Sequence, residues 1–132
     1  MDTNSQIVMK ALQAFANCSF ILGELAINLR KHPQIIRALN ALEFRQYQTG
    51  SMVEGYVDVE LQDGRALCWW IDIQWQETWK ISSRIYLNDS EEQKTVHEFT
   101  ERLTSDLDTC IYEIDIATHE LVRFDALKLI GL

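Results

Sequence analysis

The sequence predicts a single α+β domain over residues 1–132. We expect an antiparallel β-meander of about four strands, packed by a long N-terminal helix, a short second helix and a C-terminal helix. Apolar residues recur at helical spacing early in the chain, alternate at every second position in the middle, and return to helical spacing near the end. The chain has 132 residues, of which 47% are hydrophobic, and this size and composition suit one core.

Residues 4–31 are predicted to form the long N-terminal helix, with Asn4 or Ser5 as its cap. Side chains of one mainly apolar stripe follow at alternating spacings of four and three: Val8, Leu12, Phe15, Ser19, Leu22, Ala26 and Leu29. The remaining side is also apolar, because it carries Ile7, Ala14, Phe20, Ile21 and Ile27. A helix that packs on one sheet normally has a polar side about as wide as its apolar side. We therefore expect this helix to be covered on two sides, by another helix or by a second subunit.

The next segment is predicted to be the short second helix. Pro33 suits the first position of a helix, because its ring already has the helical backbone angle. Four apolar residues would form the buried side of this helix before it ends near Arg45 or Gln46: Ile35, Ile36, Leu39 and Leu42.

From Ser51 the apolar period changes to two, which indicates strands. Gly64 suits the last, left-handed position of a three-residue hairpin loop over residues 62–64. A loop of this length places Val57 opposite Trp69, so that one face of the two strands is continuously apolar. A third strand follows over residues 79–87, after a turn near residues 76–78.

Residues 95–103 fit either a helix or a fourth strand. We prefer the strand, because Ser105 and Asp108 form the capping pattern that opens the C-terminal helix. Apolar residues then return at helical spacing: Leu107, Ile111, Ile114, Leu121 and Val122. The tail over residues 126–132 is apolar for a chain end, so we expect it to dock on the rest of the domain.

One row of side chains on the predicted outer face of the sheet is a candidate binding surface. The register places Tyr56, Trp70 and Arg84 side by side, and Glu98 extends the row if Thr95 pairs with Leu87. We expect the Arg84 guanidinium to lie beside Trp70 in a cation–π contact, held by a carboxylate. Such cross-strand pairs also stabilise solvated sheets without any binding role. The predicted partner-binding residues are Tyr56, Trp70, Asp72, Arg84 and Glu98.

Charge and composition disfavour several classes of function. The chain has 20 acidic and 12 basic side chains and a net charge of −8, which repels nucleic acid. A helix over residues 11–29 would carry Glu24 and several amides through lipid, which disfavours a membrane span. The three Cys residues are far apart and form no CxxC pair, as expected of buried thiols in the cytoplasm.

The sequence contains no motif that predicts a catalytic, cofactor or metal site. His97-Glu98 and His119-Glu120 each place a His before a Glu, but neither pair completes the zinc motif HExxH. There is no glycine-rich phosphate loop and no GxSxG elbow. We therefore expect no cofactor and no metal.

Two classes of function remain. The first is a non-enzymatic protein-interaction domain: an adaptor, a chaperone-like homodimer, or an inhibitor of a basic partner. Small acidic α+β bacterial proteins such as secretion chaperones and toxin-immunity proteins share this size and charge, although the chain has no motif in common with them. The alternative is a small-molecule-binding domain or enzyme, with a pocket between the helices and Trp69, Trp75 and Trp79 on the inner face. His97 buried beside Glu101 in such a pocket would favour the enzyme.

Overall fold

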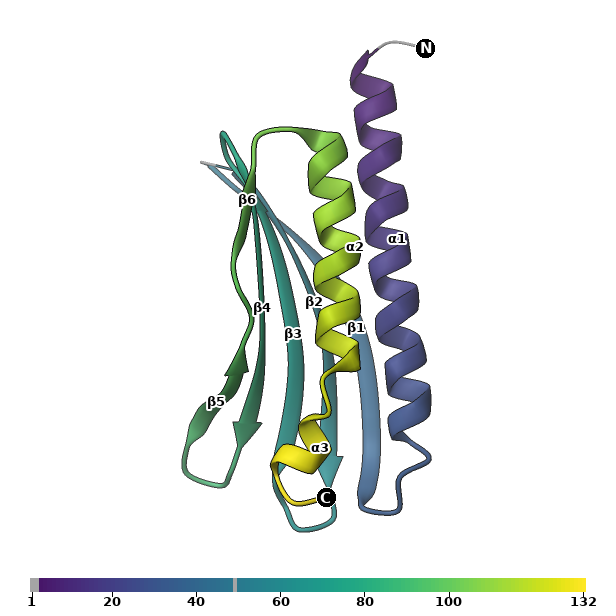
Figure 1. Ribbon diagram of the computed structural model, residues 1–132, viewed down its shortest axis with the longest axis vertical. Helices are drawn as coiled ribbons and strands as arrows, with labels where there is room; N and C mark the ends of the chain where they lie inside the picture. Colours follow the sequence, from purple (N-terminus) through teal and green to yellow (C-terminus); the bar gives the residue numbers. More distant parts are fainter. Residues whose placement is uncertain (1–2, 49) are drawn as a thin grey trace.

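An antiparallel sheet with two long helices on one of its faces forms this protein (Figure 1). The computed structural model describes residues 3–48 and 50–132. In chain order the elements are α1 (Thr3–Leu29), β1 (Ile35–Tyr47), β2 (Gly50–Leu61), β3 (Ala66–Trp75), β4 (Trp79–Asn88), β5 (Gln93–Glu98), β6 (Arg102–Thr104), α2 (Leu107–Arg123) and α3 (Ala126–Leu129). The predicted α+β class with an antiparallel sheet is confirmed.

The strands follow one another across the sheet in the order β1-β2-β3-β4-β5, and β6 pairs with the other end of β4. Strand β1 is therefore one edge, while β5 and β6 together form the other. Helix α1 contacts β1 and β2, and α2 contacts β3 and β4, so both helices cover the same face. We call this the inner face. No helix of the described residues covers the opposite, outer face.

The predicted second helix is wrong, because Ile35–Tyr47 is the strand β1 and pairs with β2 along its length. Apolar residues in this segment fit both periods. Four of the five even-numbered positions from 36 to 44 are apolar, which is the alternation of a strand. A short isolated helix is only marginally stable. Pairing with β2 instead satisfies the backbone hydrogen bonds, buries Ala38 and packs Leu42 against the core. The register shift between Ile35 and Arg37 also buries Ile35.

The predicted hairpin between β2 and β3 is confirmed. Val57 pairs with Trp69 and Val59 pairs with Leu67, as the three-residue loop requires. Gly64 has φ +90°, and its backbone nitrogen donates to the Leu61 oxygen at 3.1 Å. The next turn leaves Trp75 opposite Trp79. Both loop lengths therefore keep the apolar side chains of neighbouring strands on the inner face.

The preference for a strand over residues 95–103 is confirmed, although the strand is broken into β5 and β6. A bulge on β5 makes Thr95 pair with Tyr86 instead of Leu87, whereas Glu98 pairs with Arg84 as predicted. The extra residue of the bulge restores the predicted register further along the strand. The cap of α2 is Asp106, whose carboxylate accepts from the Thr109 nitrogen at 3.0 Å. The predicted cap at Ser105 is one residue too early.

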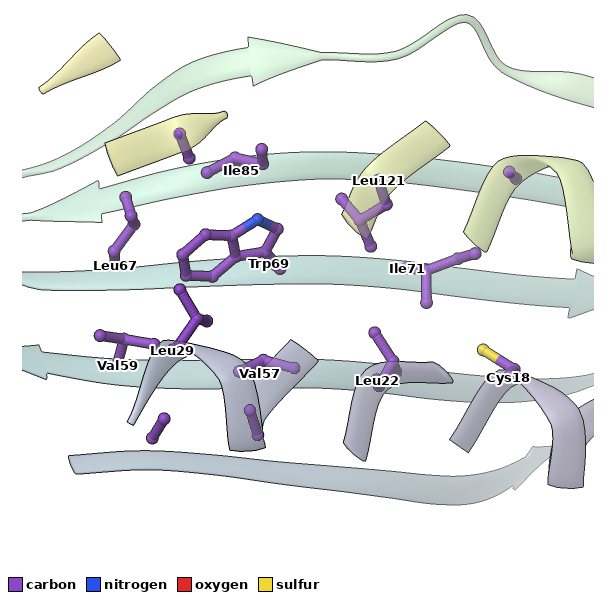
Figure 2. Packing of buried hydrophobic residues seen from close by; sticks show 14 of the residues in the cluster. Cys18, Leu22, Leu29, Val57, Val59, Leu67, Trp69, Ile71, Ile85 and Leu121 are labelled. Carbon is purple, nitrogen blue, oxygen red and sulfur yellow. The ribbon is translucent and has the colours of Figure 1, made fainter. Parts of the chain in front are cut away.

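The core lies between the inner face and the helices (Figure 2). Trp69 on β3 lies at its centre, between Leu29 of α1 and Ile85 of β4, and it is only 1% exposed. The C-terminal segment docks as expected, since Ala126 is buried and Leu127 and Ile130 pack against the core. The three cysteines are free and buried, and burial raises the pKa of the Cys110 thiol to about 12.

Helix α1 is covered on one flank by α2 and on another by the sheet. Residues Val8–Leu29 are long and apolar enough to cross a membrane, with a mean hydropathy of 1.2. In this structure Cys18, Leu22 and Ala26 of the helix lie in the core, an arrangement typical of soluble α+β folds. Phe20 and Ile27 on the opposite side stay more than half exposed. The cover on two sides predicted from the sequence is therefore provided by the sheet and by α2, while the outward side of the helix stays exposed.

Candidate functional site

Four of the predicted site residues form one row across the outer face. Tyr56 pairs with Trp70, Trp70 pairs with Arg84, and Arg84 pairs with Glu98, so the row crosses β2, β3, β4 and β5. We call these four residues the outer row. Asp72, the fifth predicted residue, lies on the same face, two residues along β3 from Trp70. The arrangement follows from the loop lengths, because each turn keeps even positions of β2, β3 and β4 on the outer face.

Tyr56 and Trp70 form the aromatic part of the outer row. Their rings are stacked, with centroids 5.7 Å apart and planes 9° from parallel. The Tyr56 hydroxyl donates to Glu43 Oε1 at 3.1 Å. Burial, together with this bond to Glu43, raises the pKa of Tyr56. The hydroxyl therefore stays protonated, and the two rings form a pre-ordered platform that exposes apolar surface beside polar groups.

Arg84 contacts a different aromatic ring from the one predicted. Its guanidinium carbon lies 5.8 Å from the centroid of Tyr86, two residues along β4. Glu98 lies opposite Arg84 in register, but among the described residues no ion pair joins them. The prediction of a cation–π contact between Arg84 and Trp70 is therefore wrong, and so is the prediction that a carboxylate binds the Arg84 guanidinium. Register determines which Cα atoms are neighbours, whereas the side-chain torsions of a long arginine decide what its head touches.

Asp72 is a nearly buried carboxylate at the side of the outer row. It is 8% exposed, and its Oδ2 accepts from Trp70 Nε1 at 3.4 Å. Burial raises the pKa of Asp72, while the Trp70 bond and the nearby charges of Arg84 and Lys80 act in the opposite direction. Asp72 Oδ1 and Arg84 Nε are buried atoms without a hydrogen-bond partner in the described chain. Neighbouring side chains shield both atoms, so a partner cannot reach them while these side chains stay in place.

The outer face carries more carboxylates than cations. Its acidic residues on the paired strands are Glu43, Glu54, Asp58, Glu60, Asp72 and Glu98, and its basic residues are Arg37, Arg45, Lys80 and Arg84. Glu54 is nearly buried and pairs with Arg45 at 3.5 Å. The face is therefore negative overall, in keeping with the net charge of −8.

A second candidate site is an apolar groove between the N-terminal half of α1 and the adjoining ends of the strands. Its volume is about 550 Å³. Apart from Ser51 and the backbone, its walls are apolar: Val8, Ala11, Leu12, Phe15, Leu42, Phe44, Met52, Val53, Ile73, Trp75 and Trp79. Trp75, which is 44% exposed, and Trp79 have ring centroids 5.8 Å apart. Two of the three predicted tryptophans therefore line a pocket, whereas Trp69 belongs to the core.

The groove includes residues that sequence reasoning placed in a helix. Leu42 and Phe44 both lie on the inner face of β1, opposite Gly55 and Val53. The alternation of apolar residues from 36 to 44 was the signal that could have found them. In the predicted fold this segment was a helix, so β2 was the last strand of the inner face. The predicted fold therefore had no β1 side chains to form this wall of the groove.

The arrangement that would favour an enzyme, with His97 buried beside Glu101 in a pocket, does not form. His97 lies between two aromatic rings, with its centroid 4.5 Å from Phe99 and 4.1 Å from Phe124. Glu101 is exposed and lies 3.7 Å from Lys80 Nζ. Within residues 3–48 and 50–132, no group of three or more His, Cys, Asp or Glu side chains could hold a metal ion.

Comparison of the chain with protein families, with curated proteins and with solved structures finds no match. The outer row and the apolar groove are therefore interpreted from their own geometry and chemistry.

Proposed function

We infer that this protein is a non-enzymatic protein-interaction domain of the adaptor, chaperone or inhibitor type, and that it binds a partner protein on its outer face. The main support for this proposal is the outer row, which crosses four strands on the face that no described helix covers. Tyr, Trp and Arg are the residue types most enriched where alanine substitution weakens protein complexes. A cytoplasmic location, suggested by the free and buried thiols, belongs to this proposal.

The charges of the outer face point to a basic partner. Carboxylates surround the stacked rings of Tyr56 and Trp70, so an arginine or lysine from the partner meets an aromatic platform beside acceptors. The exposed carboxylate of Glu98, at one end of the outer row, accepts from such a cation. Negative charge on the face also speeds the encounter with a positive partner, and salt weakens this effect.

Trp70→Ala is expected to weaken the complex at least roughly tenfold, because it removes the central ring of the outer row. A photo-crosslinking residue at position 58, which is exposed beside the outer row, first identifies the partner in the native cell, and titration of the purified pair then gives the dissociation constant. Tyr112→Ala is the matched control, since Tyr112 is also an exposed aromatic residue but lies on α2, on the helical side. Equal affinity for the Trp70 variant and the parent would contradict the proposal.

The apolar groove supports a second candidate function, the binding of a small apolar molecule. Its volume and its apolar walls suit a ligand of the size of a fatty acyl chain or an aromatic ring system. Because Trp75 and Trp79 line it, a bound ligand is expected to change the tryptophan fluorescence. Leu12→Glu is expected to abolish binding of a long-chain fatty acid by placing a charge in an apolar wall. Trp70→Ala leaves this binding unchanged, and so separates the two candidates.

A further inference from the structure

One edge of the molecule exposes an unusual amount of apolar surface. It consists of β1, which is the free edge of the sheet, and of the side of α1 turned away from α2. Five of its large apolar residues are at least half exposed: Phe20 and Ile27 on α1, and Ile36, Leu39 and Phe44 on β1. We call these two segments together the β1–α1 edge; in Figure 1 they lie side by side.

Strand β1 leaves one row of backbone groups available for a further strand. It has 13 residues and pairs with β2 on one side, while no strand of the described residues lies on its other side. Alternate residues of an edge strand direct their N–H and C=O groups away from the sheet. Native proteins usually protect such an edge, because it is a ready template for pairing. Here Arg30 Nε covers one carbonyl, that of Ala38, at 2.9 Å.

We propose that a second copy of this chain binds this edge, with the two β1 strands antiparallel about a two-fold axis at Asn40. In a two-fold interface, each contact of residue i with residue j is repeated as a contact of j with i. Pairing Asn40 with Asn40 of the partner subunit then determines the other pairs from residue 37 to residue 43, the regular part of the strand.

The charges of β1 match in this register. Arg37 lies opposite Glu43 of the partner subunit, and Glu43 lies opposite Arg37 of the partner subunit, both on the outer face. Shifting the axis to Ala41 places Arg37 against Arg45 of the partner subunit, and shifting it to Leu39 leaves Arg37 against Ala41 of the partner subunit. Opposite charges directly across two strands stabilise the pair, whereas like charges destabilise it. Among these three registers, charge therefore selects the one centred on Asn40.

The apolar residues of β1 match in the same register. Ile36, at the register shift, lies near Phe44 of the partner subunit, and Leu39 lies opposite Ala41 of the partner subunit. Three of the exposed apolar side chains of the single chain are thus covered without exposing new ones. Backbone pairing at Ala38 with Leu42 of the partner subunit replaces the Arg30 contact, which a surface arginine gives up readily.

Helix α1 leads independently to the same axis. A Cβ placed on Gly23 would lie 3.5 Å from the Asn40 amide nitrogen, so Gly23 sits beside Asn40 at the same level of the edge. Phe20 and Ile27 lie about one helical turn on either side of Gly23. A two-fold axis at this level therefore brings Phe20 towards Ile27 of the partner subunit, while Gly23 lets α1 lie close to Asn40 on its own β1. The charged residues of β1 and the exposed apolar residues of α1 therefore indicate the same two-fold axis, at the level of Asn40.

This assembly does not rest on the proposed function, because it uses the edge of the sheet and leaves the four residues of the outer row uncovered. The edge and the outer row share only Glu43, which accepts from the Tyr56 hydroxyl. It joins the outer faces of the two copies into one continuous surface that carries two outer rows. A partner with two basic segments can then bind both rows at once, which raises its apparent affinity without any new contact.

Exchange of charges on β1 tests the register as well as the association. The mass in solution is measured by light scattering over a range of protein concentrations, with the full chain. We expect a dimer for the parent chain, and at least a roughly tenfold weaker dimer for Arg37→Glu alone and for Glu43→Arg alone, because each places like charges opposite one another. An equimolar mixture of the two variants is expected to dimerise like the parent, since every introduced charge then faces its opposite.

The controls make every outcome informative. Tyr112→Glu places a charge on α2, on the flank of α1 that faces α2, and is expected to leave the dimer unchanged. Circular dichroism of each variant establishes that it is folded, and recovery in the mixture excludes a folding defect. A parent chain that stays monomeric at all concentrations overturns the proposal, and so does a mixture that stays monomeric. A monomer that binds anionic phospholipid vesicles, and loses this binding with Phe20→Glu, assigns the apolar side of α1 to a membrane surface instead.

Discussion

Trp69→Ala is expected to lower the free energy of unfolding by about 3–5 kcal/mol, as is usual when a buried aromatic side chain is truncated. Trp69 is 1% exposed and lies under both helices, between residues of α1 and β4 (Figure 2). Its indole nitrogen has no hydrogen-bond partner in the described chain, so the loss is one of packing and apolar burial. Domains are typically stable by about 5–15 kcal/mol, which makes this change a large share of the total.

Urea unfolding followed by circular dichroism measures this loss, and Trp75→Ala is the matched control. Trp75 ends the same strand on the same face but is 44% exposed at the rim of the apolar groove. We expect its truncation to cost less than about 1.5 kcal/mol, because the ring is half hydrated before the change. Equal losses for the two variants would contradict the placement of Trp69 at the centre of the core.

Gly55→Val is expected to destabilise the fold by about 1–3 kcal/mol through overpacking. Gly55 lies on the inner face of β2, between Leu42 of β1 and Ile71 of β3. A Cβ at this position would lie 2.9 Å from Leu22 Cδ1 of α1 and 3.0 Å from Leu42 Cδ1. Helix α1 can therefore approach β2 closely only because the strand has no side chain there.

A double-mutant cycle with Leu22→Ala identifies the cause of this loss. Leu22→Ala alone is expected to cost about 2–5 kcal/mol, since Leu22 is fully buried. If the added valine and Leu22 compete for the same space, the double variant loses less than the sum of the two single variants. Additive losses would show that Gly55 is needed for its backbone and not for the contact with α1.

Much of the candidate site could be predicted because its cause is local. The alternation of residues 53–61 and 66–75 specifies which side chains share a face, and Gly64 specifies the loop length that sets the register. From these, the neighbours Tyr56, Trp70 and Arg84 follow without knowledge of the rest of the fold. Glu98 also holds its predicted place, although a bulge on β5 changed the pairing of Thr95.

The contacts within the row could not be predicted in the same way. Arg84 has several rotatable bonds, and its head rests over Tyr86 instead of Trp70. The raised pKa of Asp72 depends on burial by its neighbours, which alternation alone does not specify. Side-chain torsions and burial are properties of the packed sheet, so they had to come from the structure.

The sequence by itself determined the α+β class, the long first helix, the hairpin register and the outer row, because periodicity and turn chemistry act over a few residues. Only the tertiary structure decided that Ile35–Tyr47 is a strand, because its apolar residues suit both periods and β2 supplies the pairing partner. That strand in turn supplies Leu42 and Phe44 to the apolar groove and forms the free edge beside α1. Long-range pairing thus created the two surfaces that local patterns could not show.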